Sequence, residues 1–271
     1  MDAKTQIEHQ FSGFLKTPNL WLNTAPIGVQ PFIIEDSNLN FEEDLKPLNQ
    51  RLGKRIEEFV EFCLNGSDVI SHLKKSLQIK SGKQTIGELD FLFIENNNPI
   101  HLEVAYKFYL HDPNLGDLKT IESWVGPNKK DNLYLKSEKL RLKQLPLLYH
   151  KESARILETF QMNPSNITQR LSFKAQLYVP YNSEVNDFGV LNPDCVAGYY
   201  LHQHQLSVLQ DSNIYIPKKL NWGSEPQATA DYRSFQIVIE ELLVMLQSQR
   251  SPLLWLKSSN GDYSRCFVVW W

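Results

Sequence analysis

Residues 86–110 decide the fold, and they read IGELDFLFIENNNPIHLEVAYKFYL. Apolar residues alternate with other residues over 86–94 and again over 100–110, which is the period of a β-strand. The first run has apolar residues on both faces, which is typical of a central, buried strand. The segment ENNNP at 95–99 has the composition of a tight turn. This stretch therefore predicts a β-hairpin with strands at Ile86–Ile94 and Ile100–Leu110.

The register of this hairpin decides whether two acids meet. If residues 95–98 form the loop, Ile94 pairs with Pro99 and Asp90 faces Glu103. Opposed side chains lie roughly 5 Å apart at Cβ, so two carboxylates there repel each other. A divalent cation, Mg²⁺ or Mn²⁺, would hold such a pair together. Two alternatives stay open: a loop longer by one residue sets Asp90 against Val104, or the polar face of the strand simply meets solvent.

The segment before the hairpin adds a third acid. A helix is expected at about Leu48–Leu64, with Ile56, Phe59 and Val60 in its apolar stripe. Glu57 falls at the edge of that stripe, where it could approach the strand carboxylates. The alternative is an ordinary glutamate at the boundary between core and solvent.

The segment after the hairpin is basic. Residues 129–151 carry seven Lys or Arg against two acids. A helix is expected from Asn132 toward His150, with Asp131 as its cap and Pro146 as a kink or an end. Gln144 faces inward on that helix, where it would bond either to backbone or to a site. The lysines that could contact phosphate are Lys129, Lys130, Lys136 and Lys143, although such a run is also typical of a solvated helix face.

Coarser expectations cover the rest of the chain. They comprise a short helix at Thr5–Lys16, a helix or turn at Val69–Ser76, a helix at Tyr232–Gln247, and strands at Ser172–Val179, Cys195–Leu201, Asn213–Ile216, Leu253–Lys257 and Cys266–Trp271. The turn-rich residues 163–166 suggest a division near residue 165. The expected parts are an N-terminal arm over 1–47, a core over 48–165, and a C-terminal α+β part over 166–271 that is either separate from the core or continuous with it.

Composition narrows the class of protein. A net charge of −3 argues against a protein that coats nucleic acid non-specifically. The N-terminus lacks the pattern of a signal peptide, and no apolar run reaches the roughly 18 residues that span a bilayer. The three cysteines are widely spaced, as expected for reduced core residues of a cytoplasmic protein.

The order of these elements resembles the PD-(D/E)XK nuclease superfamily. That order is a helix with Glu57, a strand with Asp90, a strand with Glu103 and Lys107, and a helix with Gln144. The superfamily cleaves phosphodiesters with a divalent metal. The resemblance also implies an α/β fold, namely a restriction-endonuclease-like core with a mixed central sheet flanked by helices. In the superfamily a lysine follows the acid by two residues, and here that position is Ala105. Lys107 is two residues further along the same face, about 7 Å away.

Several blocks also resemble a bacterial family known as domain of unknown function 1853. The blocks are RLG at 51–53, GELD at 87–90, HLEVAYKFYL at 101–110 and WVGPN at 124–128, together with Lys136, Gln144-Leu145, Pro217-Lys218 and Trp222. The resemblance runs over roughly residues 48–271.

The resulting hypothesis is a Mg²⁺- or Mn²⁺-dependent nuclease that acts on DNA or another nucleic acid. Asp90 and Glu103 would hold the metal, and Lys107 would orient water or stabilise charge on the phosphate. Glu57 would take a second metal or a water, and Gln144 would position the site. The alternatives are a degenerate member of the same fold that binds nucleic acid or protein without cutting, and a structural protein with neither role.

Overall fold

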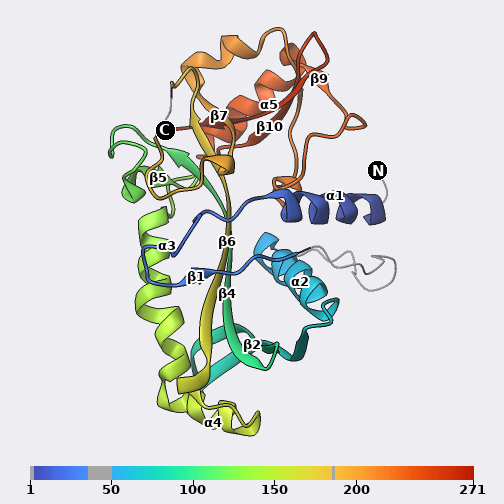
Figure 1. The fold of residues 1–271 in the computed structure, drawn as a ribbon. Coiled ribbons are helices and arrows are strands. Elements are labelled where there is room, and N and C mark those ends of the chain that lie inside the picture. Colours follow the sequence, from blue (N-terminus) through green and yellow to red (C-terminus); the bar gives the residue numbers. More distant parts are fainter. Residues whose placement is uncertain (1–2, 36–50, 185–186) are drawn as a thin grey trace. The chain divides into compact units, whose positions relative to one another are not determined.

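The computed structural model describes residues 3–35, 51–184 and 187–271 (Figure 1). The protein is mixed α/β, and its described residues form a mixed sheet of 11 strands. The strands are β1 (Gln30–Pro31), β2 (Ile70–Ser81), β3 (Gln84–Glu95), β4 (Asn98–His111), β5 (Trp124–Val125), β6 (Thr168–Pro180), β7 (Val196–His202), β8 (Asn213–Tyr215), β9 (Arg233–Ser234), β10 (Leu253–Lys257) and β11 (Tyr263–Val269). The α-helices are α1 (Ala3–Lys16), α2 (Leu52–Asn65), α3 (Leu133–Lys139), α4 (Lys151–Thr159) and α5 (Phe235–Gln247).

The strand order confirms the predicted α/β class with a mixed sheet. Hydrogen-bonded neighbours follow the order β2-β3-β4-β6-β7-β11-β10-β8-β9, with β1 beside β6 and β5 beside β4. The pairs β1–β6, β6–β7 and β7–β11 are parallel, whereas β2–β3, β3–β4 and β10–β11 are antiparallel. The finer expectation, a restriction-endonuclease-like core with a C-terminal extension, stays a prediction.

Two compact units divide the chain. The first comprises Met1–Pro18, described from residue 3, with Lys107–Tyr134 and Ala175–Trp271. The second comprises the described residues of Asn19–Tyr106 and Leu135–Lys174. Strands β4 and β6 contribute residues to both units. The expected boundary at 47 lies outside the described residues, and the boundary at 165 stays a prediction.

The hairpin β3–β4 has the register that its sequence predicted. Ile94 pairs with Pro99, and Leu92 pairs with His101. The loop is tighter than expected, because Glu95 and Asn98 still pair and only Asn96 and Asn97 form the turn. Both turn residues have positive φ, 47° and 66°, as a type I′ hairpin turn requires. Asparagine adopts this left-handed conformation more easily than most residues.

Strand β2 corrects the expected helix or turn at Val69–Ser76. Residues 70–81 form a strand that pairs with β3, although the pairing shifts between Ser71 and Lys74. His72 and Ser76 have positive φ values of 54° and 51°. These irregularities break the two-residue period, so Ile70, Leu73 and Leu77 recur at a spacing typical of a helix.

The segment expected as one helix from Asn132 to His150 is instead composite. Helix α3 ends at Lys139, a π-turn covers Leu140–Gln144, and a 3₁₀ turn covers Leu145–Tyr149. Pro146 lies in the 3₁₀ turn, so the α-helix ends before it, as proline favours. The Asp131 carboxylate accepts a hydrogen bond from Lys107. Helix α4 then starts after His150, whose ring accepts a bond from the Glu152 N–H.

This composite segment packs on the hairpin through an apolar cluster. Its buried members are Ile79, Leu89, Leu92, Leu147, Leu148, Leu157 and Ile167. Gly87 leaves room for the contact, because a Cβ there would lie 2.5 Å from Leu147 Cδ2. The cluster therefore fixes the π-turn and Gln144 relative to β3.

The remaining expected elements are largely confirmed. Strand β10 has the predicted bounds, α1 and α5 lie within a few residues of theirs, and β11 starts three residues before its predicted start. The predicted helix at Leu48–Leu64 is α2, and residues 48–50 lie outside the described residues. Among the helices that the structure describes, none is long and apolar enough to cross a membrane.

Candidate functional site

Asp90 and Glu103 lie where the β-ladder is interrupted. Described pairing between β3 and β4 ends at Phe91 with Leu102. Beyond that pair, Asp90 Oδ2 accepts a hydrogen bond from the Val104 N–H at 2.9 Å. On the other edge of β3 the register brings Ser76, with φ of 51°, opposite Asp90. Bulges and strained residues of this kind concentrate at functional sites.

The two acids differ in exposure, and burial shifts the pKa of Asp90. Glu103 has no exposed surface, and Asp90 is half-buried. Burial first, and then the charges of Glu103 and Glu57, raise the pKa of Asp90 to about 8, although the Val104 N–H and the Lys136 charge act in the opposite direction. Since carboxylates ordinarily ionise near pH 4, the Asp90 carboxyl holds a proton at neutral pH unless a cation is bound beside it.

Gln144 contacts Glu103 directly. Its Nε2 donates to Glu103 Oε2 at 2.5 Å, and its Oε1 accepts a bond from Lys136 Nζ at 2.9 Å. The π-turn over Leu140–Gln144 positions this amide, and π-turns within helices are frequent at functional sites. The structure therefore brings Gln144 and Lys136 together with the acid pair.

Glu57 lies close enough for its charge to act on Asp90. It accepts a hydrogen bond from Lys54 Nζ at 2.6 Å and a long one from Ser76 Oγ at 3.5 Å. Lys54 Nζ is also 3.6 Å from Glu88 Oε1. Sequence reasoning missed Lys54, although its position three residues before Glu57 was a usable signal.

A cavity opens beside Glu57. Its volume is about 400 Å³, and its lining residues are Arg51, Lys54, Glu57, Glu58, Lys75 and Ser76. Three of the lining residues are cations and two are glutamates, so the lining carries charges of both signs. Lys54 and Lys75 are paired with Glu57 and Glu61, respectively.

The structure gives Lys107 a different partner. Its Nζ forms a 2.7 Å ion pair with Asp131 Oδ2, and both residues belong to the first unit. The acid pair, Glu57, Gln144 and Lys136 all belong to the second unit. The Lys107 ammonium is therefore engaged by Asp131, and its expected role beside the acids stays a prediction.

The four lysines expected to contact phosphate do not share one surface helix. Lys129 pairs with Asp112 Oδ2 at 2.6 Å and lies 3.9 Å from the centre of the Trp271 ring. Lys130 is exposed and precedes α3. Lys136 bonds to Gln144, and Lys143 is exposed in the π-turn. Lys129 is thus ion-paired within the first unit, and the expected phosphate contacts of the four lysines stay predictions.

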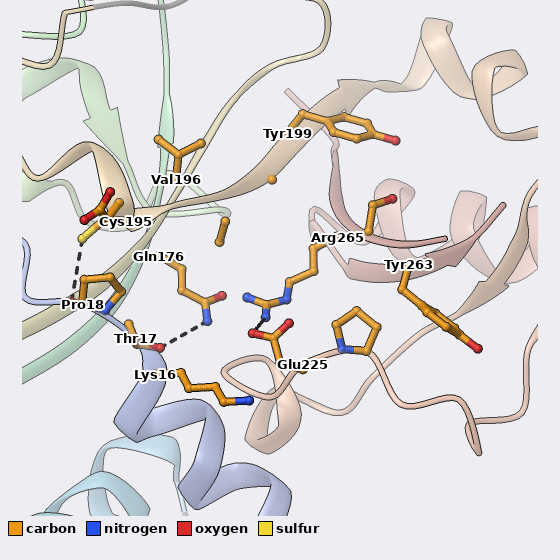
Figure 2. Close-up of a pocket in the computed structure, with 15 residues that line it drawn as sticks. Lys16, Thr17, Pro18, Gln176, Cys195, Val196, Tyr199, Glu225, Tyr263 and Arg265 are labelled. Carbon is orange, nitrogen blue, oxygen red and sulfur yellow. Dashed lines mark hydrogen bonds and ion pairs between the residues drawn. The ribbon is translucent and has the colours of Figure 1, made fainter. Parts of the chain in front are cut away.

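The first unit contains a separate cavity of about 390 Å³, shown in Figure 2. Buried Arg265 forms a 2.5 Å ion pair with Glu225 there, and Gln176 donates to Thr17 Oγ1 at 3.4 Å. No sequence pattern indicated this cavity, and it includes none of the acids of the second unit.

The acid pair offers carboxylate oxygens, the ligands that Mg²⁺ and Mn²⁺ prefer. Among the described residues, no group of three or more His, Cys, Asp or Glu is arranged to hold a metal. Mg²⁺ needs only one or two carboxylates, because water and substrate oxygens complete its shell. A cation between Asp90 and Glu103 would also offset the burial and repulsion that raise the pKa of Asp90.

Comparison with known proteins names a family without a function. No curated protein and no solved structure matches the chain significantly. None of the comparisons connects it to PD-(D/E)XK nucleases. The model described as "Domain of unknown function (DUF1853)" matches residues 31–269. Since this match covers most of the sequence, the chain belongs to the DUF1853 family.

Proposed function

We propose that the protein is a Mg²⁺-dependent phosphodiesterase that acts on nucleic acid, with Asp90 and Glu103 as the metal ligands. One observation carries the proposal. Two carboxylates meet at a buried break in the β-ladder, and an amide and an ammonium group adjoin them. A buried acid pair is costly to the fold without a cation, which favours a functional reason for it.

The residues around the acid pair would have different roles in the reaction. Bound Mg²⁺ would supply Lewis acidity and a water of lowered pKa. Gln144 holds Glu103 in orientation, and Glu57 is available to a second ion or a water. The cations that line the cavity beside Glu57 would contact neighbouring phosphates.

We assign the charge-stabilising lysine of this site to Lys136. Lys136 reaches Glu103 through one amide, and its charge acts on Asp90. Lys107 is held by Asp131 at 2.7 Å.

A second candidate function is binding without cleavage. Ala105 favours it, because the position of the superfamily lysine carries no charge. The same acid pair would then hold a cation that binds a phosphate but activates no water.

The deciding experiment measures cleavage of single- and double-stranded DNA and RNA with Mg²⁺, with Mn²⁺ and with chelator. We expect metal-dependent cleavage that Asp90→Asn and Glu103→Gln each abolish. Asp262→Asn, an exposed aspartate in the β10–β11 turn, is the matched control. Binding without cleavage would select the second candidate. If Mg²⁺ also fails to raise the melting temperature of the parent chain, the metal site itself is wrong.

A paired substitution tests the lysine assignment. Lys136→Met should lower the cleavage rate on the order of 10²–10³-fold, as loss of a charge-stabilising group does. Lys107→Met should leave the rate near that of the parent and lower stability by about 1 kcal/mol or less, since its ion pair is partly exposed. The reverse pattern would return the role to Lys107.

A further inference from the structure

His101 is a buried histidine that the proposed chemistry does not use. It has no exposed surface, and it lies two residues before Glu103 on β4. One ring nitrogen, Nε2, is 3.1 Å from Glu103 Oε1, and the other, Nδ1, is 2.9 Å from Gln169 Nε2. Gln169 lies on β6, and it also donates to the Leu145 carbonyl at 2.8 Å.

These contacts determine which ring nitrogen carries the proton. A backbone carbonyl only accepts hydrogen bonds, so the side-chain group of Gln169 that faces Leu145 must be the NH₂ group. The second hydrogen of that group then points to His101 Nδ1. Nδ1 is therefore an acceptor, and the proton of the neutral ring lies on Nε2, from which it is donated to Glu103.

We infer that Gln169 and His101 are positioning residues that hold Glu103 in the orientation needed to bind the cation. Glu103 Oε1 accepts from His101, and Glu103 Oε2 accepts from Gln144. Each carboxylate oxygen keeps a further lone pair for a metal ion. Metal ligands in proteins are commonly oriented in this way by an outer layer of hydrogen bonds. The role toward the cation rests on the proposed function, whereas the hydrogen-bond chain does not.

The hydrogen-bond chain is tested directly by nitrogen NMR of the histidine rings in the metal-free full-length chain. Loss of one signal set in His101→Gln assigns the ring among the seven histidines. We expect the Nε2–H tautomer. An Nδ1–H tautomer would mean that Gln169 does not donate to the ring, and it would overturn the inference.

The positioning role is tested with Gln169→Glu. A carboxylate at 169 accepts a hydrogen bond from Nδ1 instead of donating to it, so Nδ1 should carry a proton and the neutral ring should no longer be held as the Nε2–H tautomer. The affinity for Mg²⁺, measured by calorimetry, should fall 10- to 100-fold, the usual loss for an outer-layer partner. Gln169→Met, which also lacks a donor, should lower the affinity without adding a charge.

Gln84→Glu, at an exposed position of β3, is the matched control and should leave both the tautomer and the affinity unchanged. Unchanged Mg²⁺ affinity in both Gln169 variants would overturn the positioning role. If the parent chain binds no Mg²⁺, the proposed function and the positioning role fail together, and the tautomer still decides whether the hydrogen-bond chain exists.

Discussion

Two aspartates show how local contacts decide the charge of a buried acid. Burial raises the pKa of Asp112, but hydrogen bonds from Lys129 and Asn114 outweigh it, so the pKa lies below the usual range. Burial also raises the pKa of Asp90, and there a single N–H bond and the charge of Lys136 do not outweigh the neighbouring acids. Asp112 is thus the anionic partner in an ordinary structural ion pair, whereas the surroundings of Asp90 disfavour its charged form.

Asp90→Asn should stabilise the metal-free protein at high pH. Between pH 3.8 and about 8 the folded state holds a proton on Asp90 that the unfolded state releases. The contribution of Asp90 to stability is therefore full below pH 3.8 and is lost as the pH rises toward 8. Asparagine carries no such dependence, so the gain should be about 1–3 kcal/mol at pH 8 and smaller at pH 5.

Urea unfolding at both pH values measures this difference. Asp262→Asn should show no comparable change between pH 5 and pH 8. An equal effect of Asp90→Asn at both pH values would mean that Asp90 is ionised throughout.

At the scale of elements, the turn of the hairpin sets the register that brings the acids together. Asn96 and Asn97 both adopt positive φ, and a two-residue turn of this type matches the twist of the strands. A shift by one residue would move every side chain of β4 to the opposite face. The site in the sheet therefore depends on a turn at the end of the hairpin.

Asn97→Gly should stabilise the protein by about 0.5–1 kcal/mol, because glycine adopts positive φ without steric cost. Asn98→Gly is the matched control. Asn98 lies in β4, where glycine should lower the stability of the protein by a similar amount. Thermal unfolding of the two variants should shift in opposite directions, and a shared direction would contradict the assignment of the turn to 96–97.

At the scale of the whole molecule, each compact unit is built from segments distant in sequence. The second unit needs residues up to Lys174. Leu171 and Phe173 in that last segment are each 1% exposed, and β1 pairs with Arg170 and Leu171. The part of β6 up to Lys174, which follows residue 165, thus belongs to the same compact unit as the hairpin that carries the acids.

A fragment of residues 1–165 should therefore not fold cooperatively. Losing two core side chains at about 2–5 kcal/mol each removes most of a typical stability of 5–15 kcal/mol. Circular dichroism during urea unfolding should show a broad, shallow transition for the fragment and a sharp one for the full chain. A sharp transition in the fragment would instead support a domain boundary at residue 165.

The sequence by itself determined the elements whose pattern is local. Alternation and the Asn-rich turn predicted the β3–β4 hairpin and its register, because strand period and turn type depend only on neighbouring residues. The same holds for α1, α5 and β10. The inward-facing position of Gln144 was also predicted, although from a continuous helix where the structure has a π-turn.

Tertiary structure decided what depends on partners far apart in sequence. The bulged segment β2 is a strand because β3 supplies its hydrogen bonds, although the apolar residues of β2 have a spacing typical of a helix. Lys107 pairs with Asp131 and Lys136 with Gln144, although both lysines were candidates for contact with phosphate. Gln169 meets His101 from 68 residues away. Long side chains take the partner that folding brings within reach, and no local pattern in the sequence encodes that choice.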